Sequence, residues 1–156
     1  MAQLVDSDQK KLSMQEIIDI AAEMTKSEHT KEQVLGAIYK ELTMDGSIVV
    51  QIGNTIFMVH RAPTKPSTAL MRALNADAAQ KYLDNSEEFA KMAYNEYGID
   101  TIVSQYTDPT LSKIFAYVGR NKPKGMGYAV HKLPDGKTYQ AVAKLGPPKK
   151  ADKWAQ

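Results

Sequence analysis

The residues that most often carry metal or acid–base chemistry are few and widely spaced in this chain. The three histidines are His29, His60 and His131, and none stands at ligand spacing from another histidine or from a carboxylate. His60 and His131 fall in β-rich runs, where we expect partly buried or surface-facing rings. Cysteine is absent, which excludes thiolate ligands and disulfides and fits a reducing compartment. Neither a Gly-x-Ser-x-Gly elbow nor a Walker loop is present, so the sequence favours no metal site and no enzyme of those classes.

The basic end of the chain is the second place where chemistry is concentrated. Residues 1–118 carry 11 Lys/Arg against 16 Asp/Glu, and residues 119–156 carry nine against two, which leaves net charges of −5 and +7. The candidate interaction residues are Arg120, Lys122, Lys124, Lys149, Lys150, Lys153 and Trp154. Such a cluster suits phosphates, with Tyr128 and Trp154 stacking on bases, or an acidic protein surface, or simply solvent. The acidic first portion favours a protein partner or self-assembly over nucleic acid.

The first half of the chain reads as a polar arm, two helices and a hairpin. Residues 1–12 are mostly polar and are expected to form the arm. Two capping boxes predict helix starts, one with Ser13 and Glu16 and one with Thr30 and Gln33. Two β-rich runs within residues 47–60 flank Gly53-Asn54, a dipeptide that suits a type II′ turn. The pattern predicts a hairpin there.

The second half continues with alternating helix and strand signals. Pro63 and Pro66 predict a loop or sheet edge, and residues 68–74 fit either a short strand or the start of a helix. Asn75 or Asp77 is expected to cap a short helix through Leu83. The elements expected after it are a helix opened by Asn85 and ending at Gly98, a strand over 99–106, a helix over 109–118 capped by Asp108, a hairpin over 126–145, and a basic tail over 146–156.

This order of elements resembles the GNAT superfamily of N-acetyltransferases, apart from a first strand that the sequence does not reveal. After their fifth strand, family members often carry an Asn-capped helix with a tyrosine seven residues on and a glycine eleven residues on. Asp108, Phe115 and Gly119 hold these positions here. The resemblance implies a single α+β domain over residues 13–145, with a mixed sheet flanked by helices.

The chain also departs from the family pattern at two positions that matter for catalysis. Family acetyltransferases hold the pyrophosphate of acetyl-CoA on N–H groups of a Gly-rich loop that opens the central helix. The segments 74–80 and 82–88 contain no glycine, and Asp84, Glu87 and Glu88 are expected to repel a pyrophosphate there. Phe115 also stands where the family often has a proton-donating tyrosine, and a phenyl ring has no proton to donate. We therefore expect no cofactor and no catalytic residue.

The function that the sequence favours is a non-catalytic GNAT-like structural or interaction protein. It is similar in style to small GNAT-like proteins of bacteriophages, including internal virion proteins, which implies the cytoplasm of a host cell or a virion. An active acetyl-CoA-dependent N-acetyltransferase is the first alternative. A winged-helix nucleic-acid-binding module over residues 13–60 is the second, although the predicted second helix shows no basic face. No apolar run approaches the roughly 20 residues needed to span a bilayer, and Met1 to Lys11 lack a signal-peptide core.

Overall fold

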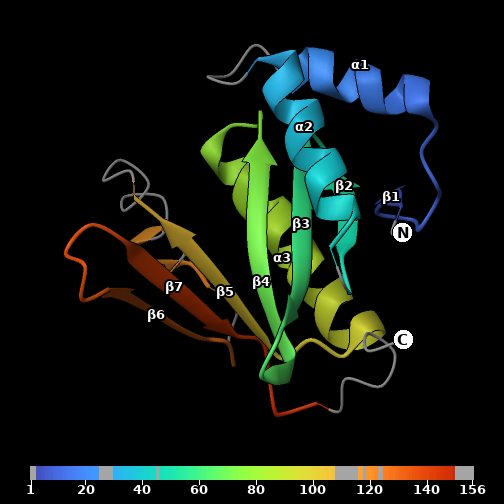
Figure 1. Cartoon of the computed structure of the whole chain (residues 1–156). Helices are drawn as coiled ribbons and strands as arrows, with labels where there is room; N and C mark the ends of the chain where they lie inside the picture. Colours follow the sequence, from blue (N-terminus) through green and yellow to red (C-terminus); the bar gives the residue numbers. More distant parts are fainter. Residues whose placement is uncertain are drawn as a thin grey trace. The chain divides into compact units, whose positions relative to one another are not determined.

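The strands are joined into one mixed sheet with helices beside it. The computed structural model describes residues 3–24, 30–44, 46–107, 116–117, 119–122 and 125–149. Hydrogen bonds join seven strands in the order β1-β2-β3-β4-β5-β7-β6. The elements, shown in Figure 1, are β1 (Leu4–Asp6), α1 (Met14–Met24), α2 (Lys31–Leu42), β2 (Ile48–Ile52), β3 (Thr55–Ala62), β4 (Lys65–Asn75), α3 (Ala79–Tyr97), β5 (Thr101–Tyr106), β6 (Gly127–Lys132) and β7 (Tyr139–Lys144). This is the α+β class that the sequence predicts.

The chain divides into two compact units. The first comprises Met1–His60 with Arg72–Phe89, and the second comprises Arg61–Met71 with Ala90–Gln156. Both ladders that hold β4 to β5 and β5 to β7 lie in the second unit, and the ladders that join β1, β2 and β3 lie in the first. The predicted domain over residues 13–145 is thus organised as two packed units.

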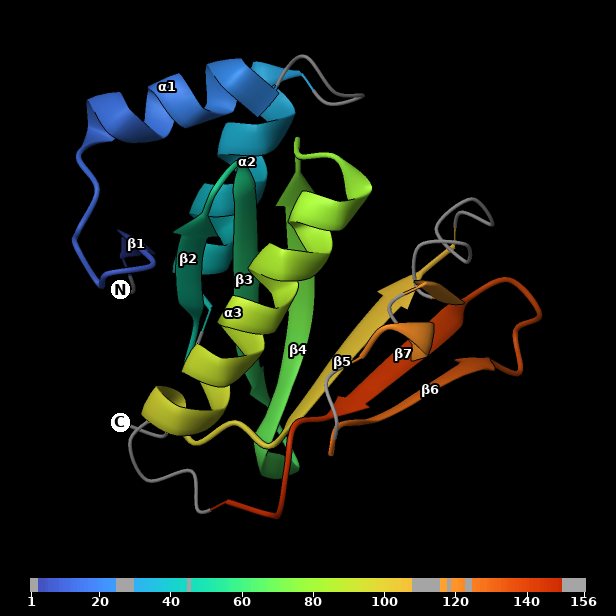
Figure 2. The same ribbon diagram turned by 180° about the vertical axis from the view of Figure 1, so that it is seen from behind.

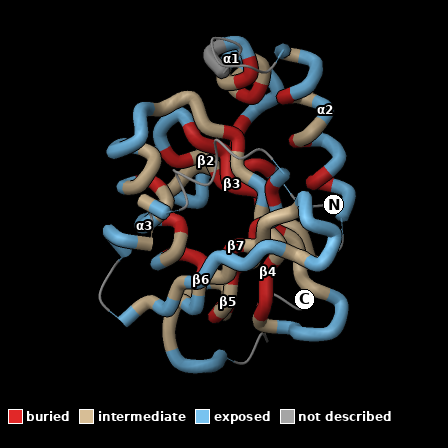
Figure 3. Tube along the Cα trace, turned by 90° about the vertical axis from the view of Figure 1, so that its left-hand side faces the viewer, coloured by how far each residue is buried: buried red, intermediate tan, exposed pale blue. Residues whose placement is uncertain are grey.

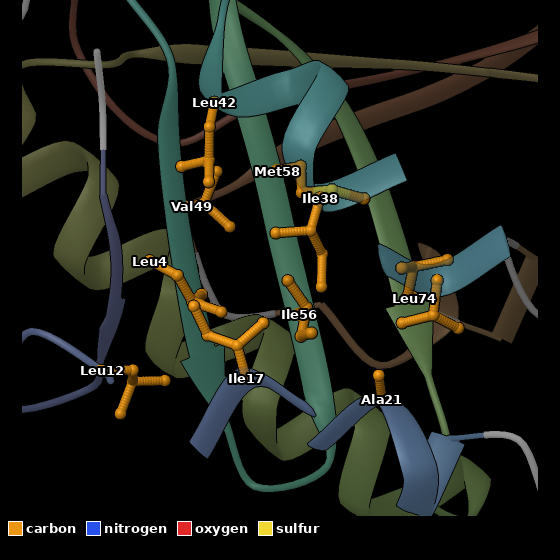
Figure 4. Packing of buried hydrophobic residues seen from close by; sticks show 11 residues of the cluster. Leu4, Leu12, Ile17, Ala21, Ile38, Leu42, Val49, Ile56, Met58 and Leu74 are labelled. Atoms are coloured by element: carbon orange, nitrogen blue, oxygen red, sulfur yellow. The ribbon is translucent and has the colours of Figure 1, made fainter. Parts of the chain in front are cut away.

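In the first unit, the sheet is covered on both faces. A cluster of buried apolar side chains, including Ile38 of α2 and Met58 of β3, fills the face under α1 and α2 (Figure 4). On the opposite face Phe57 stacks on Phe89 of α3, with ring centres 4.6 Å apart and planes only 4° from parallel. Figure 2 shows α3 on the side of the sheet away from α2. Because both faces are covered, residues 55–59 of β3 are all buried, as the red trace in Figure 3 shows.

The predicted polar arm is in part a strand. Residues Leu4–Asp6 form β1, which pairs in parallel with β2. Leu4 and Leu12 are buried in the cluster under the helices, and these two leucines provide the apolar contacts that hold the segment. The sequence did not reveal this strand, because three residues with one buried side chain are too few to show the alternation of apolar and polar residues that marks a strand. This strand is the first strand that the family resemblance implies.

The capping boxes and the first hairpin are confirmed. Ser13 and Glu16 exchange backbone-to-side-chain hydrogen bonds at the start of α1, and Thr30 and Gln33 do the same at α2. The hairpin turns at Gly53-Asn54, where Gly53 alone has a positive φ, of 57°, as the first central position of a type II′ turn requires. Since β2 also pairs with β1, the hairpin belongs to the large sheet and not to a separate winged-helix module, which contradicts that alternative.

Around the third helix, one open alternative is decided and one prediction is wrong. Residues 68–74 are strand, the first of the two alternatives, and they lie within β4, which begins at Lys65, so Pro66 lies inside the strand. The ladder of β4 with β5 begins only at Thr68, and Pro66 therefore precedes that ladder. The two expected helices are one, α3, because the side chain of Asn85 does not cap a new helix but bonds to Thr55 and Asp77 in the interior.

In the second unit, β5, β7 and β6 form a continuous antiparallel ladder. Tyr106 of β5 stacks on Tyr139 of β7 with ring centres 5.3 Å apart, and Lys132 of β6 lies over the same ring. The predicted turn of the second hairpin is held by Asp135, which accepts bonds from the Lys137 and Thr138 amides and from the Thr138 hydroxyl. These bonds lower the pKa of Asp135. The helix predicted over 109–118, with its cap Asp108 and Phe115, lies almost entirely outside the described residues.

We predict that Phe89→Ala destabilises the protein by about 3–5 kcal/mol, because it removes a buried ring that stacks on Phe57. Met44→Ala is the matched control, since Met44 is exposed and its change is expected to cost within about 0.5 kcal/mol. Urea unfolding monitored by circular dichroism measures both. A cost below about 1 kcal/mol for Phe89→Ala would show that α3 does not pack on this face.

Candidate functional site

The loop between β4 and α3 carries the densest polar cluster of the first unit. The carboxylate of Asp77 accepts hydrogen bonds from the backbone N–H of Asn54 at 2.9 Å and from the side-chain amide of Asn85 at 2.8 Å. Its second oxygen accepts a longer bond, of 3.3 Å, from the Asn54 side chain. Asn75 accepts a bond from the Asp77 backbone N–H at 3.0 Å, which folds the loop into a local turn. The loop is thus tied to the β2–β3 turn.

Buried Thr55 links this loop to the sheet. Its hydroxyl donates to Asn75 at 2.8 Å and accepts from the Asn85 amide at 3.2 Å. Asn85 is also buried, so both polar side chains have partners where water does not reach. A Cβ at Gly53 would come within 2.9 Å of Asn85 Nδ2 and Asp77 Oδ2, and only glycine lets the three segments approach so closely. We call Asn54, Thr55, Asn75, Asp77 and Asn85 the Asp77 cluster.

The Asp77 cluster occupies the loop in which the family resemblance implies a pyrophosphate site. Here, however, an internal carboxylate receives the hydrogen bonds of the β2–β3 turn and of Asn85. The acids that the sequence singled out, Asp84, Glu87 and Glu88, are exposed and lie inside α3, beyond its first turn and not in the loop before it. The acid at that place is Asp77, which the sequence suggested only as a helix cap.

A second polar pair lies under α2. Glu41 is buried, and its Oε1 lies 2.9 Å from Nδ1 of the half-buried His60 on β3. The sequence left a partly buried or a surface-facing ring open for His60, and the ring is partly buried. The sequence did not predict the partner, because Glu41 and His60 are brought together only by the packing of α2 on the sheet. His131 is exposed, and His29 lies outside the described residues. Among the described residues no three metal-ligating side chains gather.

The predicted basic interaction residues are partly engaged within the chain. Lys122 Nζ donates to the Met126 carbonyl at 2.7 Å, and Lys149 Nζ lies 4.2 Å from the centre of the Tyr94 ring, a cation–π contact. Arg120 is exposed. The other four predicted residues, Lys124, Lys150, Lys153 and Trp154, lie outside the described part of the chain.

The start of the predicted free tail packs on the second unit. The Lys149 backbone N–H donates to the buried Asp100 carboxylate at 2.7 Å, and the Tyr94 hydroxyl donates to the Pro147 carbonyl at 3.0 Å. Gly146 lies so close to Tyr94 that a Cβ would meet the ring at 2.8 Å. Residues 146–149, the start of the predicted basic tail, therefore pack on the second unit. Nothing in the Gly146-Pro147-Pro148 sequence indicated that the following Lys149 N–H would donate a hydrogen bond to Asp100.

Comparisons with known proteins give a structural similarity but no similarity in sequence. No protein-family model matches the chain, and no curated protein matches it. Among solved structures, the chain is similar to a GNAT-family acetyltransferase from Bacillus anthracis, with 12% sequence identity and a TM-score of 0.46. The similarity covers 81% of this chain and 82% of that one. No helix within the described residues is long and apolar enough to cross a membrane.

We predict that Asp77→Ala destabilises the protein by about 1–3 kcal/mol, because it leaves the buried Asn85 amide without one of its acceptors. Asp77→Asn keeps an acceptor oxygen and should cost less. Asp84→Ala is the control. Asp84 is an exposed acid on α3 that accepts a hydrogen bond from the Gln80 side chain, and its removal should cost within about 0.5 kcal/mol. Equal unfolding free energies for all three variants would argue against a structural role for the Asp77 cluster.

A second prediction concerns the docked residues 146–149. A chain that ends at Leu145 loses the bonds to Asp100 and Tyr94 and should be less stable by about 1–3 kcal/mol, since the buried Asp100 carboxylate loses a donor. A chain that ends at Lys149 keeps both bonds and serves as the control. Thermal unfolding compares the two. If both chains melt at the same temperature, residues 146–149 contribute nothing to the second unit.

Proposed function

We propose that this chain is a non-catalytic, GNAT-like protein that acts through interactions with other proteins. The observation that supports the proposal is the hydrogen bonding of Asp77. In the loop where the resemblance implies a pyrophosphate, the donors of Asn54 and Asn85 already serve a carboxylate of the chain itself. A pyrophosphate placed there would meet a like charge and would have to displace these bonds.

The loop also lacks the glycine that usually lets a phosphate group approach the backbone closely. Backbone approach to a phosphate is easiest at glycine, and residues 74–80 contain none. Asn75 and Asp77 instead use their short side chains to fold the loop back on itself. These features favour a scaffold whose cofactor function has been replaced by a structural one. The resemblance in style to small bacteriophage proteins implies a place in a larger assembly, such as a virion, and this is part of the proposal.

One observation favours the alternative, an active acetyl-CoA-dependent N-acetyltransferase. The described residues include a first strand, β1, which the resemblance implies and which the sequence did not reveal. The two candidate functions make opposite predictions for acetyl-CoA binding and for the release of CoA.

We predict that acetyl-CoA at about 100 µM leaves the melting temperature unchanged. A ligand present at about ten times its Kd would stabilise the protein by about 1.4 kcal/mol, which a thermal-shift assay detects. Asp77→Asn is the informative variant: if the Asp77 charge excludes the pyrophosphate, this variant should gain affinity, more strongly at low salt. A stabilisation of about that size in the unmodified chain would refute the non-catalytic proposal.

Turnover is tested with a thiol-reactive dye. Because the chain has no cysteine, the dye reports only free CoA released from acetyl-CoA, without background from the protein. We expect no release above the rate without protein, with polyamines, peptide N-termini and lysine as acceptors. Protein-dependent release with any of these acceptors would establish the acetyltransferase alternative.

A further inference from the structure

Within the described residues, one edge strand of the sheet is covered by another segment of the chain and the other edge strand is not. The outer side of β1 is covered by the chain itself: the Leu12 N–H donates to the Leu4 carbonyl at 3.0 Å, the Asp6 N–H donates to the Lys10 carbonyl at 2.9 Å, and Val5 forms a bridge with Lys11. At the other edge stands β6, whose one strand partner is β7. No described strand pairs with its outer side.

The hydrogen-bonding phase of β6 identifies the main-chain groups that point away from β7. At the turn, the Leu133 N–H donates to the Thr138 carbonyl at 2.8 Å, so residues 133 and 138 are a hydrogen-bonded pair. In an antiparallel ladder such pairs alternate with non-bonded ones. Ala129 and His131 therefore bond to β7, while the N–H and C=O groups of Val130 and Lys132 point outward.

This edge lacks the protections that usually prevent strand pairing. Natural edges are blunted by proline, by bulges or by charges in the middle of the strand. Residues 127–132 contain no proline, and their register with β7 is continuous over six pairs. Val130, an outward residue near the middle, is uncharged, and its side chain is 38% exposed. The one charged side chain, Lys132, stands at the end of the strand.

The charge around β6 is positive. Among the described residues between 116 and 149, one side chain is acidic, Asp135, and its oxygens are bonded to residues of its own turn. The basic ones are Arg120, Lys122, Lys132, Lys137, Lys144 and Lys149. Two of them stand at the start of β6, where Lys122 bonds to the Met126 carbonyl and Lys144 pairs with Gly127, and Lys132 stands at its end.

We propose that β6 binds an extended acidic segment of a partner protein as an additional strand. Main-chain hydrogen bonds to Val130 and Lys132 supply the affinity that any extended chain would have. The lysines at both ends of the strand select glutamate- or aspartate-rich segments. A second copy of β6 fits less well, because it would bring two basic surfaces together. The inference rests on the proposed interaction function and specifies the partner's chemistry.

The test follows amide hydrogen exchange in the full chain by NMR, with a synthetic peptide of alternating valine and glutamate, about eight residues long. With peptide at about ten times its Kd, exchange at the Val130 and Lys132 amides should slow about tenfold, since the bound strand covers them. Exchange at Ala129 and His131, which already bond to β7, should change little. The same peptide with lysine in place of glutamate should have no effect.

Three outcomes would overturn the proposal. One is no slowing at about 1 mM glutamate peptide, and another is equal slowing by the lysine peptide. The third is slowing that rises with protein concentration in the absence of peptide, which would make a second copy the occupant. Release of CoA in the dye assay would refute the non-catalytic function and leave this result standing, so the two failures are distinguishable.

Matched proline variants test the phase of the strand. Val130→Pro removes an outward N–H, a position where edge strands tolerate proline, and should abolish the peptide effect while keeping the unfolding midpoint. Ala129→Pro removes a bond to β7 and should destabilise the hairpin. Lys132→Glu serves if Val130→Pro does not fold, because it keeps the backbone and should weaken glutamate-peptide binding. Unchanged peptide binding in Lys132→Glu and in a folded Val130→Pro would contradict the assignment.

Discussion

The two-sided burial of β3 is the constraint on which the rest of the first unit depends. A strand whose neighbouring residues face opposite sides can be buried throughout only if each face is covered. Ile56 and Met58 therefore require α1 and α2, whereas Phe57 requires α3. The pairing of β1 with β2 and the burial of Leu4 follow from the same requirement, because the face under α1 and α2 extends to that edge.

Burial of β3 also brings a polar group into the interior, and the Asp77 cluster follows from it. Thr55 opens the strand and is fully buried, so its hydroxyl needs partners that water cannot supply. Asn75 and Asn85 provide them, and Asp77 in turn accepts from Asn85. The conformation of the loop before α3 thus depends on the hydrogen bonds that the buried Thr55 of the sheet requires. Asp100 has a comparable role in the second unit: its backbone groups bond to Ser67 and Leu145, which belong to segments far apart in the sequence.

The sequence revealed what depends on local chemistry. Capping boxes, the Gly53-Asn54 turn and the Asp135 turn each act over a few residues, and the strands and helices beside them were predicted to within a few positions. The sequence did not reveal the features that depend on tertiary contacts. Asn85 looks like a helix cap in isolation and becomes an interior donor only because Thr55 and Asp77 lie opposite it. The Glu41–His60 pair and the docking of Lys149 depend in the same way on residues far away in the sequence.

Charge and hydrogen bonding distinguish the Asp77 cluster of the first unit from the β6 edge of the second. In the first unit, the Asp77 carboxylate accepts hydrogen bonds from Asn54 and Asn85, so its charge stabilises the fold. In the second unit the situation is reversed. Lys122 bonds to the Met126 carbonyl and Lys144 pairs with Gly127 at the start of β6, and Lys132 stands at its end, so the outward main-chain groups of β6 lie between positively charged side chains. An anion with a peptide backbone satisfies both features of that edge, whereas a phosphate satisfies the charge and leaves the strand's amides and carbonyls to water. The proposed acidic protein segment therefore matches both the charge and the main-chain groups of the β6 edge, whereas a nucleic acid matches the charge alone.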